Sequence, residues 1–159
     1  MIRPADARQL RAALGRLDRP WQPRSGDRFC IPDRDLDDMI FVVAEMTIEV
    51  EQAAGGPLVR FNGTTEWALD TIAAEDVLWL PWEHQLRELL GARFASLEAP
   101  SAPDASANPP STQYAVTLTD GRRFVDRDPE RAYLAAVLDL LDAALLDPAL
   151  PDPALLDPA

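Results

Sequence analysis

The sequence predicts an α+β protein in which a mostly antiparallel sheet packs against an N-terminal, a middle and a C-terminal helix. Apolar residues recur at helical spacing near both ends of the chain and once in its middle. Between these stretches lie short β-branched and aromatic runs, each bounded by Gly, Pro, Asn or Asp. The 159 residues suit one domain, which we place at residues 1–146.

A helix is expected first, over Pro4–Leu17. Leu10, Leu14 and Leu17 share one stripe of this helix, and Pro4 can occupy its first turn. β-branched and aromatic residues then predict short strands at 28–31, 39–43, 46–51 and 58–61. Gly55-Gly56-Pro57 is expected to turn the chain between the last two of these strands.

The middle of the chain gives a mixed pattern. Asn62-Gly63 can form a tight hairpin turn, and residues 64–72 fit a short helix or an extended segment equally well. Residues 77–80 are extended and apolar. Pro81 then starts a helix over Trp82–Leu90, which Gly91 ends, and residues 93–97 predict another strand.

The C-terminal part carries the clearest local signals. Strands at 114–118 and 123–125 flank Asp120-Gly121, a dipeptide that suits a tight hairpin turn. Asp128-Pro-Glu is a strong helix start, because it combines a capping acid, a proline for the first turn and a second acid. The helix is expected to reach Leu146.

Two segments are expected to be disordered. Residues 99–111 form a Pro/Ala/Ser-rich loop with four Pro and no large apolar side chain. Residues 147–159 repeat Asp-Pro-Ala-Leu with a period of five, and each proline prevents the preceding helix from continuing.

Composition excludes several classes of protein. The chain has 15 Arg, no Lys and 27 acids, for a formal charge of −12, and residues 1–19 carry a local net charge of +3. We expect no nucleic-acid partner, because phosphates are bound mainly through Arg and Lys. One Cys and one His exclude an internal disulfide and multi-Cys zinc sites, and the missing Lys excludes a P-loop. Without a long apolar run, no membrane association and a cytoplasmic location are expected.

The acidic run Asp33-Arg-Asp35-Leu-Asp37-Asp38 resembles the start of a calcium loop. Its first three ligand positions fit, but a calcium loop requires Gly at position 6 and Glu at position 12, where this chain has Asp38 and Ala44. Glu45 lies one residue too late. We therefore predict an acidic turn and no bound metal or other cofactor, with Asp33, Asp35 and Asp37 as the metal candidates if one exists.

Catalytic candidates are few. His84 stands four residues before Glu88 on the middle helix, a spacing that allows contact, but no Ser or Cys in a Gly-rich elbow supplies a nucleophile. Cys30 lies between Phe29 and Ile31 and is expected to be a small buried residue. No catalytic residue is assigned.

Tryptophans supply the other interaction candidates. Trp79-Leu-Pro-Trp82 places two indoles around a helix start, and Trp67 lies in the ambiguous segment. Large aromatic side chains beside Pro are typical anchors of interaction surfaces, although core positions are the alternative. Trp67, Trp79 and Trp82 therefore join Asp35 and Asp37 as interaction candidates.

Longer motifs resemble a known set of proteins. They are Gly26-Asp-Arg-Phe, Ile31-Pro-Asp-Arg-Asp-Leu-Asp-Asp, Phe61-Asn-Gly-Thr-Thr-Glu-Trp and Trp79-Leu-Pro-Trp-Glu-His-Gln-Leu. Together they resemble small actinobacterial proteins labelled as pilus assembly proteins of the CpaE type, over residues 5–145. The later half is also similar to small phage proteins of unknown role. The resemblance implies a link to pilus assembly and carries over no catalytic residue.

Three hypotheses follow. The first is a non-enzymatic protein-interaction or accessory module with an unknown protein partner, either monomeric or weakly homo-oligomeric. The second is a small metal-dependent enzyme or hydrolase that uses Asp33, Asp35 and Glu45 or His84. The third is an acidic inhibitor or antitoxin-like protein that occupies a basic site.

Overall fold

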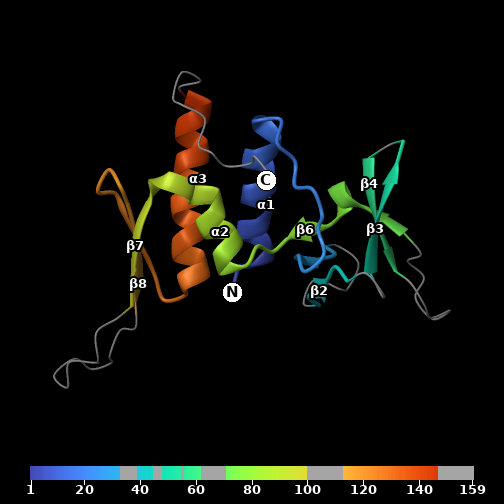
Figure 1. Ribbon diagram of the computed structural model, residues 1–159, viewed down its shortest axis with the longest axis horizontal. Coiled ribbons are helices and arrows are strands. Elements are labelled where there is room, and N and C mark those ends of the chain that lie inside the picture. The colour runs from blue at the N-terminus through green and yellow to red at the C-terminus, as the bar shows by residue number, and fades with distance from the viewer. Residues whose placement is uncertain (33–38, 45–47, 55, 62–70, 100–112, 147–159) are drawn as a thin grey trace. The chain divides into compact units, whose positions relative to one another are not determined.

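The computed structural model describes residues 1–32, 39–44, 48–54, 56–61, 71–99 and 113–146. These residues form helices and small antiparallel sheets, which confirms the predicted α+β class (Figure 1). In this part of the chain, no helix is both long and apolar enough to cross a bilayer.

Contacts divide the chain into two compact units. The N-terminal unit comprises the described residues of 3–81. The C-terminal unit comprises the described residues from 82 onward together with Met1 and Ile2. The predicted single domain at residues 1–146 stays a prediction.

The N-terminal unit begins with helix α1, Pro4–Arg16, as the leucine spacing predicted. Its first turn is closed by Asp6, whose carboxylate accepts from the Arg3 side chain at 2.8 Å. Leu10 and Leu14 lie on the buried stripe of the helix, at 1% and 3% exposure. The predicted helix over Pro4–Leu17 is therefore confirmed, with Leu17 as its C-cap.

The described residues of this unit also form two three-stranded antiparallel sheets. One has the order β2-β1-β6, with the strands Phe41–Val42, Arg28–Cys30 and Leu78–Trp79. The other has the order β3-β4-β5, with the strands Ile48–Ala53, Gly56–Phe61 and Thr71–Ala73. A short 3-10 helix, η1 (Ala74–Asp76), connects β5 to β6.

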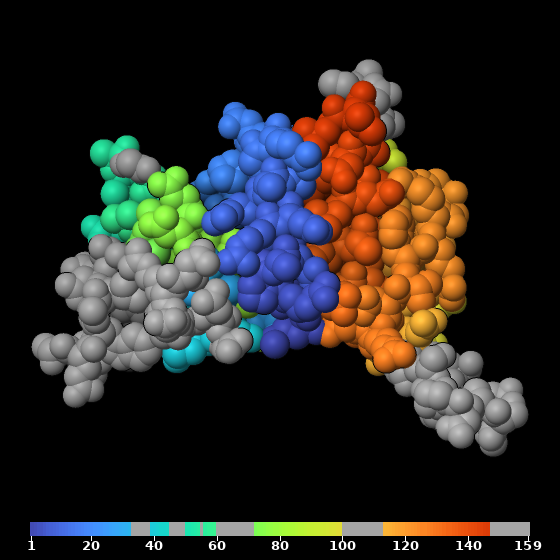
Figure 2. All heavy atoms as spheres, turned by 180° about the vertical axis from the view of Figure 1, so that it is seen from behind, coloured from blue at the N-terminus to red at the C-terminus, as the bar shows by residue number. Residues whose placement is uncertain are grey.

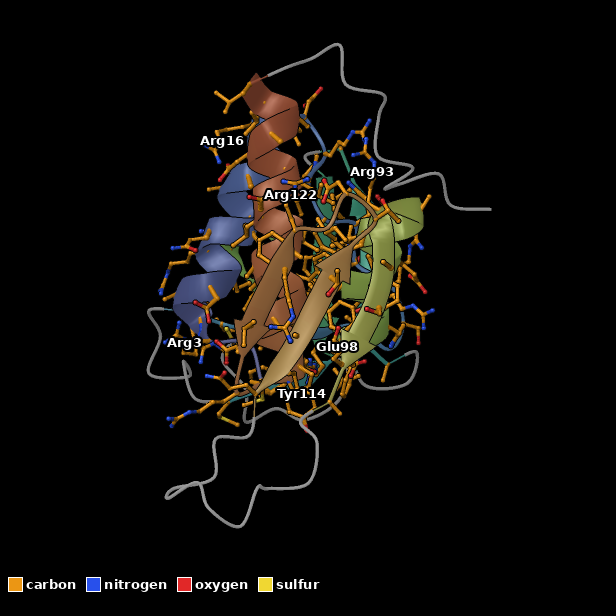
Figure 3. The ribbon with its side chains drawn as sticks, turned by 90° about the vertical axis from the view of Figure 1, so that its left-hand side faces the viewer. Arg3, Arg16, Arg93, Glu98, Tyr114 and Arg122 are labelled. Carbon is orange, nitrogen blue, oxygen red and sulfur yellow. The ribbon has the colours of Figure 1, made fainter. Side chains whose placement is uncertain are left out.

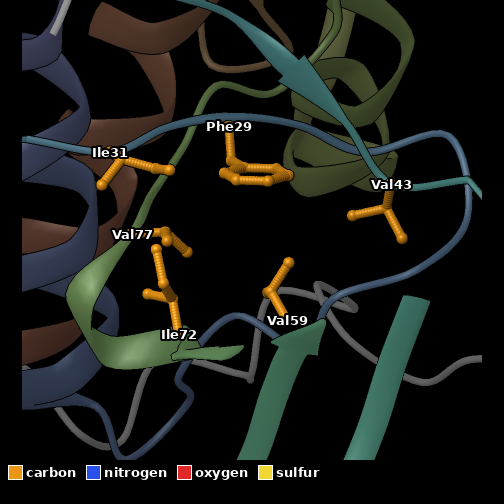
Figure 4. Close-up of a cluster of buried hydrophobic side chains, with 6 residues drawn as sticks. All are labelled: Phe29, Ile31, Val43, Val59, Ile72 and Val77. Carbon is orange, nitrogen blue, oxygen red and sulfur yellow. The ribbon is translucent and has the colours of Figure 1, made fainter. Parts of the chain in front are cut away.

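The core of this unit joins side chains from both of its sheets. Phe29 from β1, Val59 from β4 and Ile72 from β5 are each at most 3% exposed, and Ile31, Val43 and Val77 pack with them (Figure 4). Phe29 stacks on Phe41 of the neighbouring strand, with ring centroids 5.4 Å apart. Because both faces of β1 are covered, residues 29–31 are all apolar and do not alternate with polar residues.

The C-terminal unit contains helices α2 (Glu83–Leu90) and α3 (Pro129–Leu146) and the sheet β7-β8-β9. Its strands are Phe94–Glu98, Tyr114–Leu118 and Arg123–Asp126, preceded by a short 3-10 helix, η2 (Gly91–Arg93). Figure 3 looks onto this sheet with α3 behind it. Tyr133 of α3 is 1% exposed and stacks on Phe94, and burial raises the pKa of its phenol.

Local signals in this unit are confirmed almost residue for residue. The Asp128 side chain accepts from the backbone N–H of Arg131 at 3.3 Å, so it caps α3 as expected. Asp120-Gly121 forms the β8–β9 turn, where Gly121 adopts a φ of 89° and donates to Leu118. Trp82 is the N-cap of α2 and not its first residue, because its extended backbone precedes the first helical turn.

The β8–β9 turn contains a carboxylate held by a neighbouring arginine. Asp120 accepts from Arg122 Nε at 2.9 Å and from the Arg122 backbone N–H at 3.0 Å. Arg122 also pairs with Asp139 of α3. In Figure 3 Arg122 and Arg93 lie toward one end of the sheet, and Glu98 and Tyr114 lie toward the other.

We expect Asp120 to titrate below its ordinary value of 3.8, because the Arg122 side chain lowers its pKa first and the Arg122 backbone N–H lowers it further. Because the folded pKa is lowered, the stabilisation is complete above the unfolded pKa and is lost as pH falls through the folded value. Carboxyl chemical shifts during an acid titration measure this.

Arg122→Ala should return the pKa of Asp120 toward 3.8. Arg123→Ala is the matched control, since Arg123 pairs with Glu98 at 3.0 Å and does not touch Asp120. An unchanged Asp120 titration in Arg122→Ala would contradict the assignment.

Candidate functional site

A cavity of about 290 Å³ opens in the N-terminal unit. One side is α1, through Ala7, Leu10, Leu14 and Gly15, and the other side is formed by the start of β4 and the segment from β5 to β6. In Figure 2 the blue surface of α1 adjoins the light-green segment that contains η1. The volume lies just below the range of about 300–1,000 Å³ that is typical of ligand sites.

Two stacked tryptophans line the same cavity. Trp21 and Trp79 have ring centroids 6.0 Å apart and planes only 6° apart. Both are half-buried, so the pair combines a packed side with an accessible side. Pro57, Leu58 and Ala73, also half-buried, extend the apolar lining.

A buried carboxylate fixes the orientation of Trp21. Asp27 is 3% exposed, and its Oδ2 accepts from Trp21 Nε1 and from the Arg24 backbone N–H, both at 2.9 Å. A charge-assisted bond to a buried carboxylate is stronger than a neutral one. The indole of Trp21 is therefore held in place before any ligand arrives.

A buried arginine fixes the chain that follows Trp79. Arg28 of β1 is 7% exposed and donates from Nε to the Leu80 carbonyl at 3.1 Å and from Nη2 to the Pro81 carbonyl at 2.8 Å. The backbone pairing of Phe29 with Trp79 places the same strand beside the second tryptophan. Of these two adjacent charged residues, Asp27 therefore holds the Trp21 indole and Arg28 holds the backbone that follows Trp79.

Polar groups occur at the exposed part of the cavity lining. Arg11 of α1 is exposed, and its Nη1 donates to the backbone carbonyl of Glu75 at 2.8 Å. A guanidinium carries five N–H donors, so this bond leaves others for a ligand. Glu75 is exposed and Gln22 lies nearby in the lining. An apolar cavity with a few polar groups is the usual composition of a binding site.

Among the sequence-predicted residues that the structure describes, only Trp79 lies at this cavity. Trp82 is 36% exposed at the start of α2. Asp33, Asp35, Asp37, Glu45 and Trp67 lie outside the described residues. The acidic turn and the calcium-loop interpretation thus stay predictions, as do the loop at 99–111 and the repeat at 147–159.

Three of the candidates for catalysis lie within the described residues. His84 and Glu88 are both exposed on α2, and Cys30 is 1% exposed within β1, as expected for a small buried residue. Within the described ranges, no three His, Cys, Asp or Glu side chains are grouped closely enough to hold a metal ion.

Sequence reasoning missed Trp21, Asp27 and Arg28 as parts of a site. The sequence does contain a pattern that could have pointed to Trp21. Two segments, Pro20-Trp21 and Trp79-Leu-Pro81, each combine an indole with a rigid backbone. Nothing local shows that the two indoles stack across 58 positions of sequence. No protein-family model, curated protein or solved structure matches this chain.

Proposed function

We propose that this protein is a non-enzymatic interaction module that binds an apolar side chain of a protein partner in the Trp21–Trp79 cavity. The observation that carries the proposal is the stacked, half-buried indole pair over an apolar cavity, with the Trp21 indole bonded to buried Asp27. Buried charges are rare unless they are bonded, and here Asp27 binds the Trp21 indole while Arg28 binds the backbone after Trp79.

Apolar surface that stays accessible in the folded state favours an apolar ligand. Half-buried Trp21, Trp79 and Leu58 lose further contact with water when a ligand covers them, at roughly 25 cal/mol per Å² of apolar area. Because the walls are already in position, the ligand does not have to order them, and that lowers the cost of binding. Because the sequence resembles pilus assembly proteins, we propose that the partner is part of a pilus assembly.

Small blocked peptides provide the first test. We expect N-acetyl-leucinamide and N-acetyl-prolinamide to shift the indole N–H signals of Trp21 and Trp79 in proton–nitrogen NMR spectra, whereas N-acetyl-glycinamide leaves them in place. Both apolar probes bury methyl or methylene groups against the indoles, and the glycine probe does not.

Gly15 offers a way to fill the cavity without disturbing the fold. A Cβ at Gly15 meets no atom within 4 Å, and its backbone is helical, so Gly15→Leu should fold and occupy part of the cavity. Gly15→Ala is the matched control, and it should retain the shifts and slightly stabilise α1. Apolar probes that leave both indoles unshifted, or that bind Gly15→Leu as well as Gly15→Ala, would contradict the proposal.

A further inference from the structure

We propose that the occupant of the cavity is the Asp-Pro-Ala-Leu repeat at residues 147–159, supplied by a second copy of this chain. The inference rests on the proposed function, since it names the partner of the same cavity. It follows from three properties of the repeat that match the site, which are its apolar residues, its charge and its copy number.

The apolar residues of the repeat match the walls. Residues 147–159 combine Pro with Leu150, Leu155 and Leu156. Proline-rich peptides commonly bind in grooves lined by aromatic side chains, because their extended backbone is already ordered and little entropy is lost. The other Pro-rich segment, residues 99–111, has no large apolar side chain to bury. The cavity therefore favours the repeat over that segment.

The charges also match. Residues 147–159 carry three Asp and no cation, whereas residues 1–19, which include α1, have a net charge of +3. Among the described lining residues, Arg11 is the cation, and it keeps N–H donors beyond its bond to the Glu75 carbonyl. Glu75 supplies the opposing charge in the same lining. Arg11 should therefore attract the repeat and Glu75 should weaken its binding.

Copy number favours a second chain as the source. Asp147-Pro-Ala, Asp152-Pro-Ala and Asp157-Pro-Ala give three copies for the one cavity described above. Copies that one cavity cannot hold remain available to the cavities of other chains. Several copies on one chain also raise the local concentration of the repeat at each of those cavities. A tail bound in the cavity of the next molecule is a head-to-tail contact, which can continue from one molecule to another.

Sedimentation velocity of the full chain tests the inference. The full chain should associate increasingly as its concentration rises toward about 1 mM, the range of weak peptide contacts. Gly15→Leu should weaken this association about tenfold or more, because the cavity can no longer bury a leucine. Gly15→Ala should associate like the unmodified chain.

The two lining charges should act in opposite directions. Arg11→Gln should weaken association by about twofold to fivefold and Glu75→Gln should strengthen it by a similar factor, with both effects reduced at high salt. A chain in which Leu150, Leu155 and Leu156 are changed to Ser should fail to associate while it retains all its charges. The serine chain alone should not associate and Gly15→Leu alone should associate only weakly, but a mixture of the two should form complexes, since one supplies the cavity and the other supplies the repeat.

Two results would overturn the inference. One is a full chain that stays monomeric across the whole concentration range, and the other is association that Gly15→Leu and the Leu→Ser chain both retain, which would place the contact on another surface. If the blocked leucine and proline peptides still shift Trp21 and Trp79 in either case, the proposed function stands and only the repeat is excluded as the occupant.

Discussion

Phe29→Ala is expected to lower the free energy of unfolding of the N-terminal unit by about 3–5 kcal/mol. Phe29 is fully buried, stacks on Phe41 and belongs to the central strand of the sheet β2-β1-β6. Its ring reaches the cluster that also contains Val59 and Ile72 of the second sheet (Figure 4). Removing the ring leaves a cavity at the point where the two sheets share their core.

Urea denaturation followed by tryptophan fluorescence measures this loss. Trp21, Trp67 and Trp79 all belong to residues 3–81, so three of the four indoles report on this part of the chain. Because whole domains are stable by only about 5–15 kcal/mol, the variant should lose a large share of its stability and unfold at a clearly lower urea concentration.

Val125→Ala is the control, because Val125 is 44% exposed on β9 and its truncation should change stability by less than about 0.5 kcal/mol. Equal midpoints for Phe29→Ala and Val125→Ala would show that the packing around Phe29 does not stabilise the unit as we describe.

Helix ends and turns whose conformation is set by a few consecutive residues could be predicted from the sequence. The Asp120-Gly121 hairpin and the Asp128 cap of α3 are each set by two or three consecutive side chains whose backbone preferences are strong. The spacing of Leu10 and Leu14 likewise predicted α1 and its buried stripe. In each case the local preference and the tertiary structure agree.

The pairing of strands that lie far apart in the sequence could not be predicted from local patterns. Most strands could be placed, but the three-stranded sheets that the described residues form depend on pairings such as Phe29 with Trp79, which no local pattern encodes. Such non-local contacts are decided by the packing of the whole chain. Strand β5 overlaps the end of residues 64–72, which fit a short helix and an extended segment equally well, so the sequence left this strand open.

The residues of the candidate site were also hard to predict, because they come together only through long-range contacts. Trp79 was selected because it stands beside Pro81, but Trp21 was not, and only the fold stacks the two indoles. Asp27 and Arg28 look like ordinary surface charges in the sequence, since charged residues are rarely buried. Their burial can be inferred only from the backbone groups and the indole that they bind.

Arg28→Met is expected to destabilise the N-terminal unit by about 2–5 kcal/mol, the second large effect. Methionine fills much of the same space, but it leaves the buried carbonyls of Leu80 and Pro81 without their donors. An orphaned buried polar group costs about 1–3 kcal/mol, and two are created here. Arg28→Lys should lose less, because an ammonium can still bond one of the carbonyls but cannot reproduce the planar fork.

The same variant separates stability from binding. Arg28 holds the chain directly after Trp79, so in buffer that keeps Arg28→Met folded, its cavity should bind N-acetyl-leucinamide more weakly than that of the unmodified chain. Arg24→Ala is the matched control, because Arg24 is exposed and reaches Asp27 through its backbone N–H, which alanine retains. Urea midpoints and NMR titrations of the three proteins measure both effects. If Arg28→Met is as stable as Arg24→Ala, the guanidinium does not hold the chain in the way that its two carbonyl bonds indicate.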